Sequence, residues 1–127
     1  MTEISVEWMN EQRRILVLTM PEIWTVDDLM DAMDRSYALV ESVSYPVYAI
    51  ADNRLTSRLP DNMISRFAQI AQKTHPRSLK TVFVSSSTGL GDRFFQIFSR
   101  MLGRISAAGS VEEAYAMLQP EIDKQPV

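Results

Sequence analysis

The sequence predicts a single α/β domain that contains a mostly parallel sheet of four or five strands, an opening β-hairpin and about four helices. The chain has 127 residues, which is the usual length of one domain. Short apolar runs typical of strands alternate with longer amphipathic stretches typical of helices. This alternation implies β-α-β crossovers, and the expected order is β-β-α-β-α-β-α-β-α. We expect the domain to cover residues 1–119 and a flexible tail to cover residues 120–127.

Two strands are expected at the start of the chain, joined as a hairpin. Ile4, Val6 and Trp8 alternate with polar residues, which indicates a strand with one buried face. A turn at Asn10 leads into a second run, Arg14–Met20, whose central residues are apolar in succession. Continuous apolarity is typical of a strand that is covered on both faces.

The first helix has a clear start. Thr25 is a good N-cap residue, and Asp28 lies three residues later, as in a capping box. Apolar residues then recur at steps of three and four, so one stripe of the helix faces a core. This stripe consists of Val26, Leu29, Met30, Met33, Tyr37 and Val40.

The middle of the chain adds two strands and a second helix. Val47–Ala51 is a short apolar strand, and a polar loop follows it. Asp61 is suited to cap the second helix, which Pro76 closes. Thr81–Val84 is the next strand. The expected inner stripe of the second helix consists of Ile64, Phe67, Ala68 and Ala71.

The last third of the chain predicts a third helix over Leu90–Leu102 and a short strand over Arg104–Ala107. Ser110 caps the final helix, and Glu113 completes its capping box. Pro120 marks the start of the expected tail, because proline and charged residues offer little surface to bury.

Composition excludes several classes of function. Thirteen basic and 16 acidic residues give a net charge of −3, which disfavours general nucleic-acid binding. The chain has no cysteine and one histidine, His75, so we expect no metal site and no cofactor. His75 precedes a proline at a helix end and is expected to be exposed. We expect no membrane span and a cytoplasmic location, because the chain has no long apolar run and no signal-peptide pattern at its start.

Two hydroxyl-rich loops follow predicted strands, at the edge where ligands bind in open α/β sheets. Both lead into helix N-termini, which favour anions. The alternative is that the hydroxyls only cap helices and satisfy turns. The candidate regulatory loop after the third strand contains Asp52, Arg54, Thr56, Ser57 and Arg58. The candidate anion or ligand turn after the fourth strand contains Ser86, Ser87, Thr88 and Gly89.

The predicted third helix carries more apolar surface than a single core-facing stripe needs. One line along it contains Leu90, Phe94, Ile97 and Met101, and a second contains Phe95, Phe98 and Leu102. The helix is either packed on two sides within the monomer or exposes one line to a partner. The candidate interface residues are Phe94, Phe95, Phe98 and Leu102, and a homodimer is the simplest assembly.

The element order, together with three stretches of sequence, resembles the STAS domain and its SpoIIAA-like branch of bacterial anti-sigma-factor antagonists, which are also grouped with Sec14-type (CRAL-TRIO-like) folds. These stretches are the strand ending in Asp52, Val82–Ser85 leading to Phe94–Arg100, and Ser110–Ala114. The resemblance implies partner switching by phosphorylation of a serine after the third strand. Asp52 fits this pattern, and Thr56 and Ser57 lie in the matching loop, but no Ser-Gly pair opens the helix here.

Two functions follow from these observations. The first is a non-enzymatic bacterial regulatory or ligand-sensing module that acts through contacts with another protein or a second copy of the chain. The alternative is a binder of a lipid or small apolar ligand in a pocket beside the third helix. We do not expect an enzyme, because the sequence has no recognisable catalytic motif. A deep apolar cavity would favour the alternative, and a flat exposed apolar helix face would favour the first function.

Overall fold

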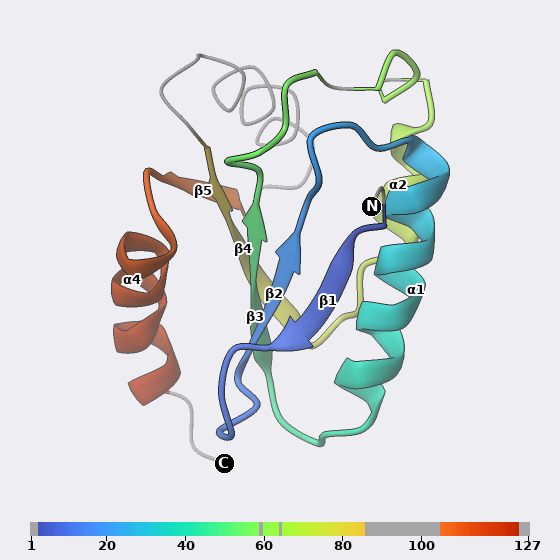
Figure 1. Cartoon of the computed structure of the whole chain (residues 1–127). Helices are drawn as coiled ribbons and strands as arrows, with labels where there is room; N and C mark the ends of the chain where they lie inside the picture. The colour runs from blue at the N-terminus through green and yellow to red at the C-terminus, as the bar shows by residue number, and fades with distance from the viewer. Residues whose placement is uncertain (1–2, 59, 64, 86–104, 125–127) are drawn as a thin grey trace.

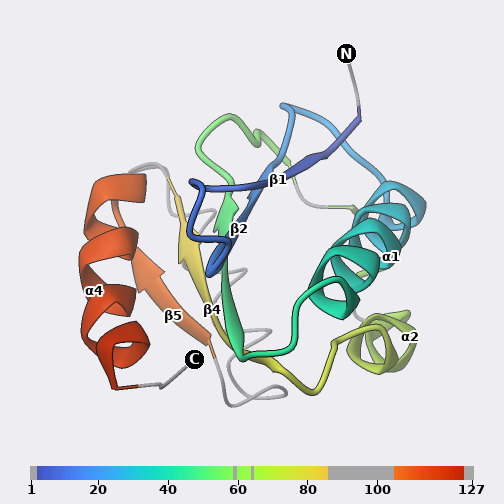
Figure 2. The ribbon, with the colours of Figure 1, turned by 90° about the horizontal axis from the view of Figure 1, so that it is seen from below.

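A computed structural model describes residues 3–58, 60–63, 65–85 and 105–124. In these ranges the chain forms one five-stranded sheet, mostly parallel, with helices on both faces (Figures 1 and 2). The predicted single α/β domain with an opening hairpin is therefore confirmed. The elements are β1 (Ser5–Trp8), β2 (Ile15–Thr19), α1 (Val26–Glu41), β3 (Val47–Asp52), α2 (Phe67–Gln72), β4 (Ser78–Val84), β5 (Ile105–Ala108) and α4 (Val111–Asp123).

The strands lie in the sheet in the same order as in the sequence, β1-β2-β3-β4-β5. β1 is antiparallel to β2, as expected for a hairpin, and the three remaining pairings are parallel. Parallel crossovers are right-handed, so strands added in one direction place their connecting helices on one face of the sheet. Accordingly, α1 and α2, which lie in two of these crossovers, cover one face of the sheet (Figure 2). α4 follows β5 in the sequence and covers the other face (Figure 2).

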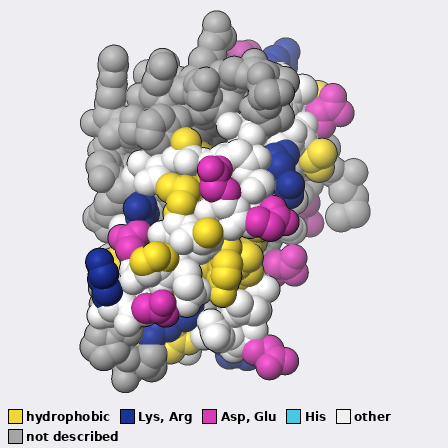
Figure 3. All heavy atoms as spheres, turned by 90° about the vertical axis from the view of Figure 1, so that its left-hand side faces the viewer, with side chains coloured by type: hydrophobic (Ala, Val, Ile, Leu, Met, Phe, Trp, Pro, Cys, Tyr) yellow, Lys and Arg dark blue, Asp and Glu magenta, His cyan; other side chains and the backbone are white. Residues whose placement is uncertain are grey.

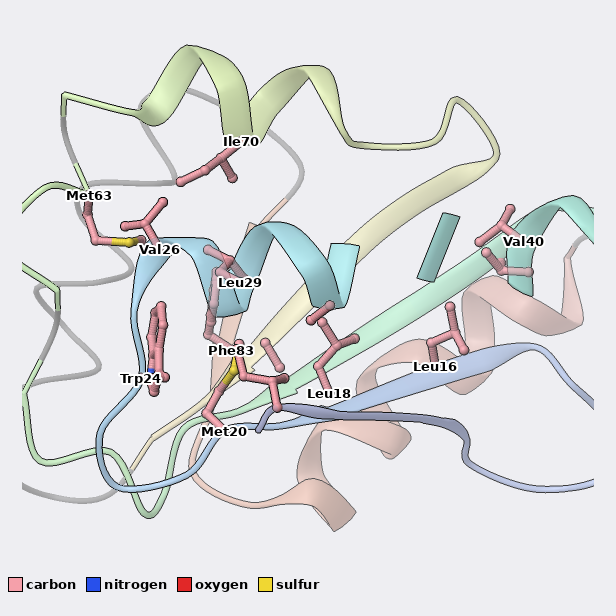
Figure 4. Packing of buried hydrophobic residues seen from close by; sticks show 14 residues of the cluster. Leu16, Leu18, Met20, Trp24, Val26, Leu29, Val40, Met63, Ile70 and Phe83 are labelled. Carbon is pink, nitrogen blue, oxygen red and sulfur yellow. The ribbon is translucent and has the colours of Figure 1, made fainter. Parts of the chain in front are cut away.

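Each face of the sheet has its own apolar core. Successive residues of a strand point to opposite faces, and β2 shows this directly. Leu16 and Leu18 pack toward α1, whereas Ile15 packs toward α4. The prediction that this strand is covered on both faces is confirmed. Figure 4 shows part of the first core, in which Trp24 and Val26 at the start of α1 lie near Met63.

The start of α1 follows from its capping residues. The Thr25 hydroxyl accepts a hydrogen bond from the Asp28 backbone N–H at 3.1 Å, and the Asp28 carboxylate accepts one from the Thr25 N–H at 2.9 Å. Two of the four orphan N–H groups of the first turn are thereby satisfied. The predicted capping box is confirmed.

The second helix is shorter than predicted. α2 begins at Phe67, whereas the sequence placed its start at Asp61, and Ala68 is exposed although it was expected to face the core. Met63 is buried in the core, and Arg66 forms an ion pair with Asp27 of α1 at 2.6 Å. These contacts with α1 hold the chain before Phe67 in turns.

The last helix is longer than predicted. α4 continues through Pro120 to Asp123, so the expectation of a loose tail from residue 120 is wrong for this stretch. Ile122 is buried against the second core, and the Glu121 carboxylate lies 3.0 Å from the Lys80 ammonium. These contacts offset the hydrogen bond that a proline cannot donate. Residues 125–127 lie outside the described ranges.

Candidate functional site

The loop after β3 contains the predicted regulatory residues. The Asp52 carboxylate is almost buried and accepts hydrogen bonds from the Arg54 backbone N–H at 3.1 Å and from its Nε and Nη2 at 3.0 and 2.9 Å. The hydrogen bond and the charge of Asp52 raise the pKa of the Arg54 guanidinium above its ordinary value. Arg54 therefore forms a bidentate ion pair with Asp52 within its own loop.

Thr56 has a structural role in this loop. Its side chain is buried, at 4% exposure, and its hydroxyl accepts a hydrogen bond from the indole Nε1 of Trp24 at 3.2 Å. The same hydroxyl donates to the Pro21 carbonyl at 3.2 Å. Thr56 therefore joins its loop to the loop that precedes α1, and a modifying enzyme would have to open both loops to reach it.

Ser57 is exposed and remains accessible. Its backbone N–H donates to the Glu22 carbonyl at 3.0 Å, and its hydroxyl lies 3.4 Å from the same oxygen. Two large apolar side chains lie on these joined loops, Ile23 at 55% exposure and Leu55 at 66%. We call Ile23, Leu55, Ser57 and the exposed Arg58 the loop surface. Its regulatory role stays a prediction.

The other two predicted sites lie in residues 86–104, outside the described part of the chain. They are the turn Ser86, Ser87, Thr88 and Gly89, and the interface residues Phe94, Phe95, Phe98 and Leu102 of the expected third helix. Both remain predictions.

An apolar cavity of about 240 Å³ lies between the sheet and the helices α1 and α2. Its floor is formed by β2, β3, β4 and β5, and its walls come from α1 and α2. Figure 4 shows Leu18, Leu29, Ile70 and Phe83 converging from these elements. The apolar lining residues are Leu16, Leu18, Met20, Leu29, Met33, Val40, Ala49, Ala51, Ile70, Ala71, Phe83 and Ile105.

The cavity has a polar end and an apolar end. Met20 and Phe83, near the carboxyl ends of their strands, lie at the apolar end together with Leu29 from the first turns of α1. The opposite end, near the start of β4, is lined by polar groups from α1 and from the chain that follows α2. These groups are Ser36, Tyr37, Lys73, Thr74, His75 and Ser78. An elongated molecule with one polar end matches this distribution.

His75 lies at the polar end of the cavity, and the expectation that it is exposed is wrong. It is buried, at 6% exposure, and its ring centroid lies 4.5 Å from that of Tyr37. The Nδ1 atom accepts a hydrogen bond from the Arg77 backbone N–H at 3.0 Å, and Nε2 lies 3.5 Å from the Glu41 carboxylate. These contacts place the ring proton on Nε2 and fix the ring between α1 and β4.

The sequence holds one signal for this cavity, the small residues of β3. Ala49 and Ala51 alternate with larger residues, face α1 and α2, and occupy less space than the Leu and Val residues of neighbouring positions. Ala71 contributes another small side chain to the cavity lining, from α2. Small side chains on facing elements leave volume between them unless the elements approach.

The surface on the α4 side of the molecule is mixed in character (Figure 3). Charged side chains of both signs are interspersed with apolar ones over the side of the molecule that carries α4 (Figure 3). Within residues 3–58, 60–63, 65–85 and 105–124, no cluster of three or more acidic or histidine side chains is arranged to hold a metal ion. No helix in the same ranges is long and apolar enough to cross a membrane.

Comparison with known proteins identifies the fold. No protein-family model and no curated protein sequence matches the chain. A solved structure of an uncharacterized protein from the DUF3478 family of Shewanella loihica PV-4, which has a SpoIIAA-like fold, matches with a TM-score of 0.70. The match covers 93% of this chain and 95% of that chain at 12% identity. The chain therefore has a SpoIIAA-like fold, as its sequence resemblance implied.

Proposed function

We propose that this protein is a non-catalytic module that binds a small apolar ligand in the cavity between α1, α2 and the sheet. The proposal corresponds to the second of the two predicted functions, with the pocket lined by residues of α1, α2 and the sheet. The third helix, beside which the pocket was expected, lies outside the described residues. One observation carries it, the cavity of about 240 Å³ with a mainly apolar lining. An engineered apolar cavity of about 150 Å³ is large enough to bind benzene. The space here suits a larger ligand.

The size of the cavity also limits the affinity. Octan-1-ol has nine non-hydrogen atoms, and small ligands gain between about 0.3 and 1.5 kcal/mol per atom. At about 0.6 kcal/mol per atom the binding free energy is about −5.4 kcal/mol, which corresponds to a dissociation constant on the order of 0.1 mM. Binding of this strength suits a sensor of an abundant metabolite or a weak carrier.

A non-catalytic role is supported by the groups that line the cavity. A catalytic site needs a nucleophile or a base with a free position directed at a substrate. Nδ1 of His75 accepts the Arg77 backbone N–H, and its Nε2 lies 3.5 Å from the Glu41 carboxylate. The Lys73 ammonium is 2.6 Å from the Asp34 carboxylate.

The methionines of this chain provide a direct test of binding. Met20 and Met33 line the cavity, whereas Met9 packs against the core on the opposite face of the sheet. We expect octan-1-ol to shift the methyl NMR signals of Met20 and Met33 saturably in protein labelled with ¹³C at methionine methyl groups. The Met9 signal should stay in place. Equal shifts at all three methyl groups, or no shift, would contradict the proposal.

A matched pair of variants on α2 separates cavity filling from general effects. Ala71 lines the cavity, whereas Ala68 lies on the exposed side of the same helix. Ala71→Leu should occupy part of the cavity and weaken octan-1-ol binding by about tenfold, the equivalent of 1.4 kcal/mol. Ala68→Leu makes the same chemical change and should leave the dissociation constant unaltered.

The loop surface favours a second candidate, regulation through contact with a protein. Ile23 and Leu55 are large, exposed and held on two loops that hydrogen bonds join, which is how an apolar interface centre is presented. A second copy of the chain is the simplest partner. Sedimentation velocity over a wide concentration range should show a dimer that the Ile23→Ser, Leu55→Ser double variant loses. A wild type that stays monomeric at the highest concentration would exclude this assembly.

A further inference from the structure

Building on the proposed ligand-binding function, we infer that the ligand is an uncharged, single-chain molecule with a hydroxyl head group, and that the cavity selects against the corresponding carboxylate. The inference rests on the charges at the walls of the cavity, on the hydrogen-bonding capacity of Ser36, and on the cavity's shape.

Among the described residues that line the cavity, the cation that faces it already has an acidic partner, because the Lys73 ammonium lies 2.6 Å from the Asp34 carboxylate. The Lys80 ammonium lies 3.0 Å from Glu121 of α4, on the opposite face of the sheet, so its charge does not face the cavity. An anionic ligand needs an uncommitted cation, because transfer of an unpaired carboxylate out of water costs several kcal/mol. A bound carboxylate would have to share Lys73 with Asp34, which would leave an excess negative charge at this end of the cavity.

The histidine at the polar end does not supply this charge, and Arg77, whose buried Nε has no hydrogen-bond partner, is not among the residues that line the cavity. Nδ1 of His75 accepts the Arg77 N–H, and its Nε2 lies 3.5 Å from the Glu41 carboxylate. The Arg77 guanidinium lies 3.8 Å from Glu41 and donates to the carbonyls of Val40 and Val43 at 2.9 and 2.7 Å. Paired as Lys73 with Asp34 and Arg77 with Glu41, the positive and negative charges of the described residues at this end cancel.

At the position of Ser36, the structure favours a head group that donates a hydrogen. Its hydroxyl lines the cavity and donates its hydrogen to the Ala32 carbonyl at 2.9 Å. The oxygen therefore offers lone pairs to the ligand and no hydrogen. An alcohol can donate to this oxygen. An ionised carboxylate can only accept, so it would face the Ser36 oxygen without a hydrogen between them.

The shape of the cavity favours a single chain. Its lining follows β4 from Ser78 to Phe83, which at about 3.3 Å per residue is a length of roughly 16 Å. Its volume of about 240 Å³ is below the roughly 300–1,000 Å³ of pockets for drug-sized ligands. A long and narrow space of this volume suits one aliphatic chain and is too small for a two-chain lipid.

A matched pair of ligands tests the inference. Octan-1-ol and octanoate have the same chain and differ in the charge of the head group. In titrations at neutral pH, monitored at the Met20 and Met33 methyl signals, we expect octanoate to bind at least about tenfold more weakly. Octanoate binding as tightly as octan-1-ol would overturn the uncharged ligand while leaving the proposed binding function in place. Binding of neither compound would overturn both.

A charge variant tests the cause of the selection. Asp34→Asn leaves the Lys73 ammonium without its carboxylate partner, and we expect it to raise octanoate affinity several-fold with no change for octan-1-ol. Asp31→Asn is the matched control, because Asp31 lies on the same helix but pairs with Arg35 at 3.0 Å. An unchanged octanoate affinity in Asp34→Asn, or an equal rise in both variants, would refute the assignment of selectivity to the paired charges.

Discussion

Thr56→Val removes one hydroxyl from the junction of two loops and preserves the shape of the side chain. The Trp24 indole loses this acceptor and the Pro21 carbonyl loses this donor, both at 3.2 Å. Loss of hydrogen bonds at buried polar groups costs about 1–3 kcal/mol. We expect the free energy of unfolding to fall by about 2 kcal/mol. With an m-value of about 2 kcal/mol/M, the urea midpoint would fall by about 1 M.

The same measurement on Ser57→Ala provides the control. Ser57 is the next residue, carries the same functional group and is exposed, with its hydroxyl 3.4 Å from the Glu22 carbonyl. We expect its loss to change stability by less than about 0.5 kcal/mol. If Thr56→Val is no more destabilising than Ser57→Ala, Thr56 does not join the two loops energetically, and the reasoning fails.

Two further changes concern helix ends. Pro120→Ala restores an N–H within α4 and should raise the free energy of unfolding by about 1 kcal/mol, visible as a higher melting temperature in calorimetry. A lower melting temperature would contradict this expectation. Thr25→Ala removes the capping box of α1 and should cost about 1 kcal/mol in urea unfolding. An unaltered midpoint would mean that solvent satisfies the first turn equally well.

Features set by neighbouring residues were predictable from the sequence. The capping box at Thr25 depends on one residue three positions later, and the two-sided burial of β2 depends on its own continuous apolarity. The start of α2 depends on contacts with a distant segment. Asp61 has the chemistry of a cap, but the ion pair between Arg66 and Asp27 joins positions 39 residues apart and leaves no local signal.

The candidate site was predictable only in part. The sequence placed Asp52, Thr56 and Ser57 in one polar loop. It did not separate the buried hydroxyl from the exposed one, because the partner that buries Thr56 is Trp24, 32 residues earlier. The cavity depends on the distance between α1 and the sheet. Periodicity identifies which residues face inward but does not show whether their side chains fill the space.

The order of strands in the sheet has a consequence for synthesis on the ribosome. Each strand pairs with the one translated before it, so the sheet can grow at one edge as the chain emerges. The helix that covers the second face, α4, is translated after all five strands of the described part of the chain. A nascent chain that has completed β5 exposes Ile15, Tyr48, Ile50 and Val82 on that face. Exposed apolar surface of this kind promotes aggregation, so a chain halted there would be a substrate for chaperones.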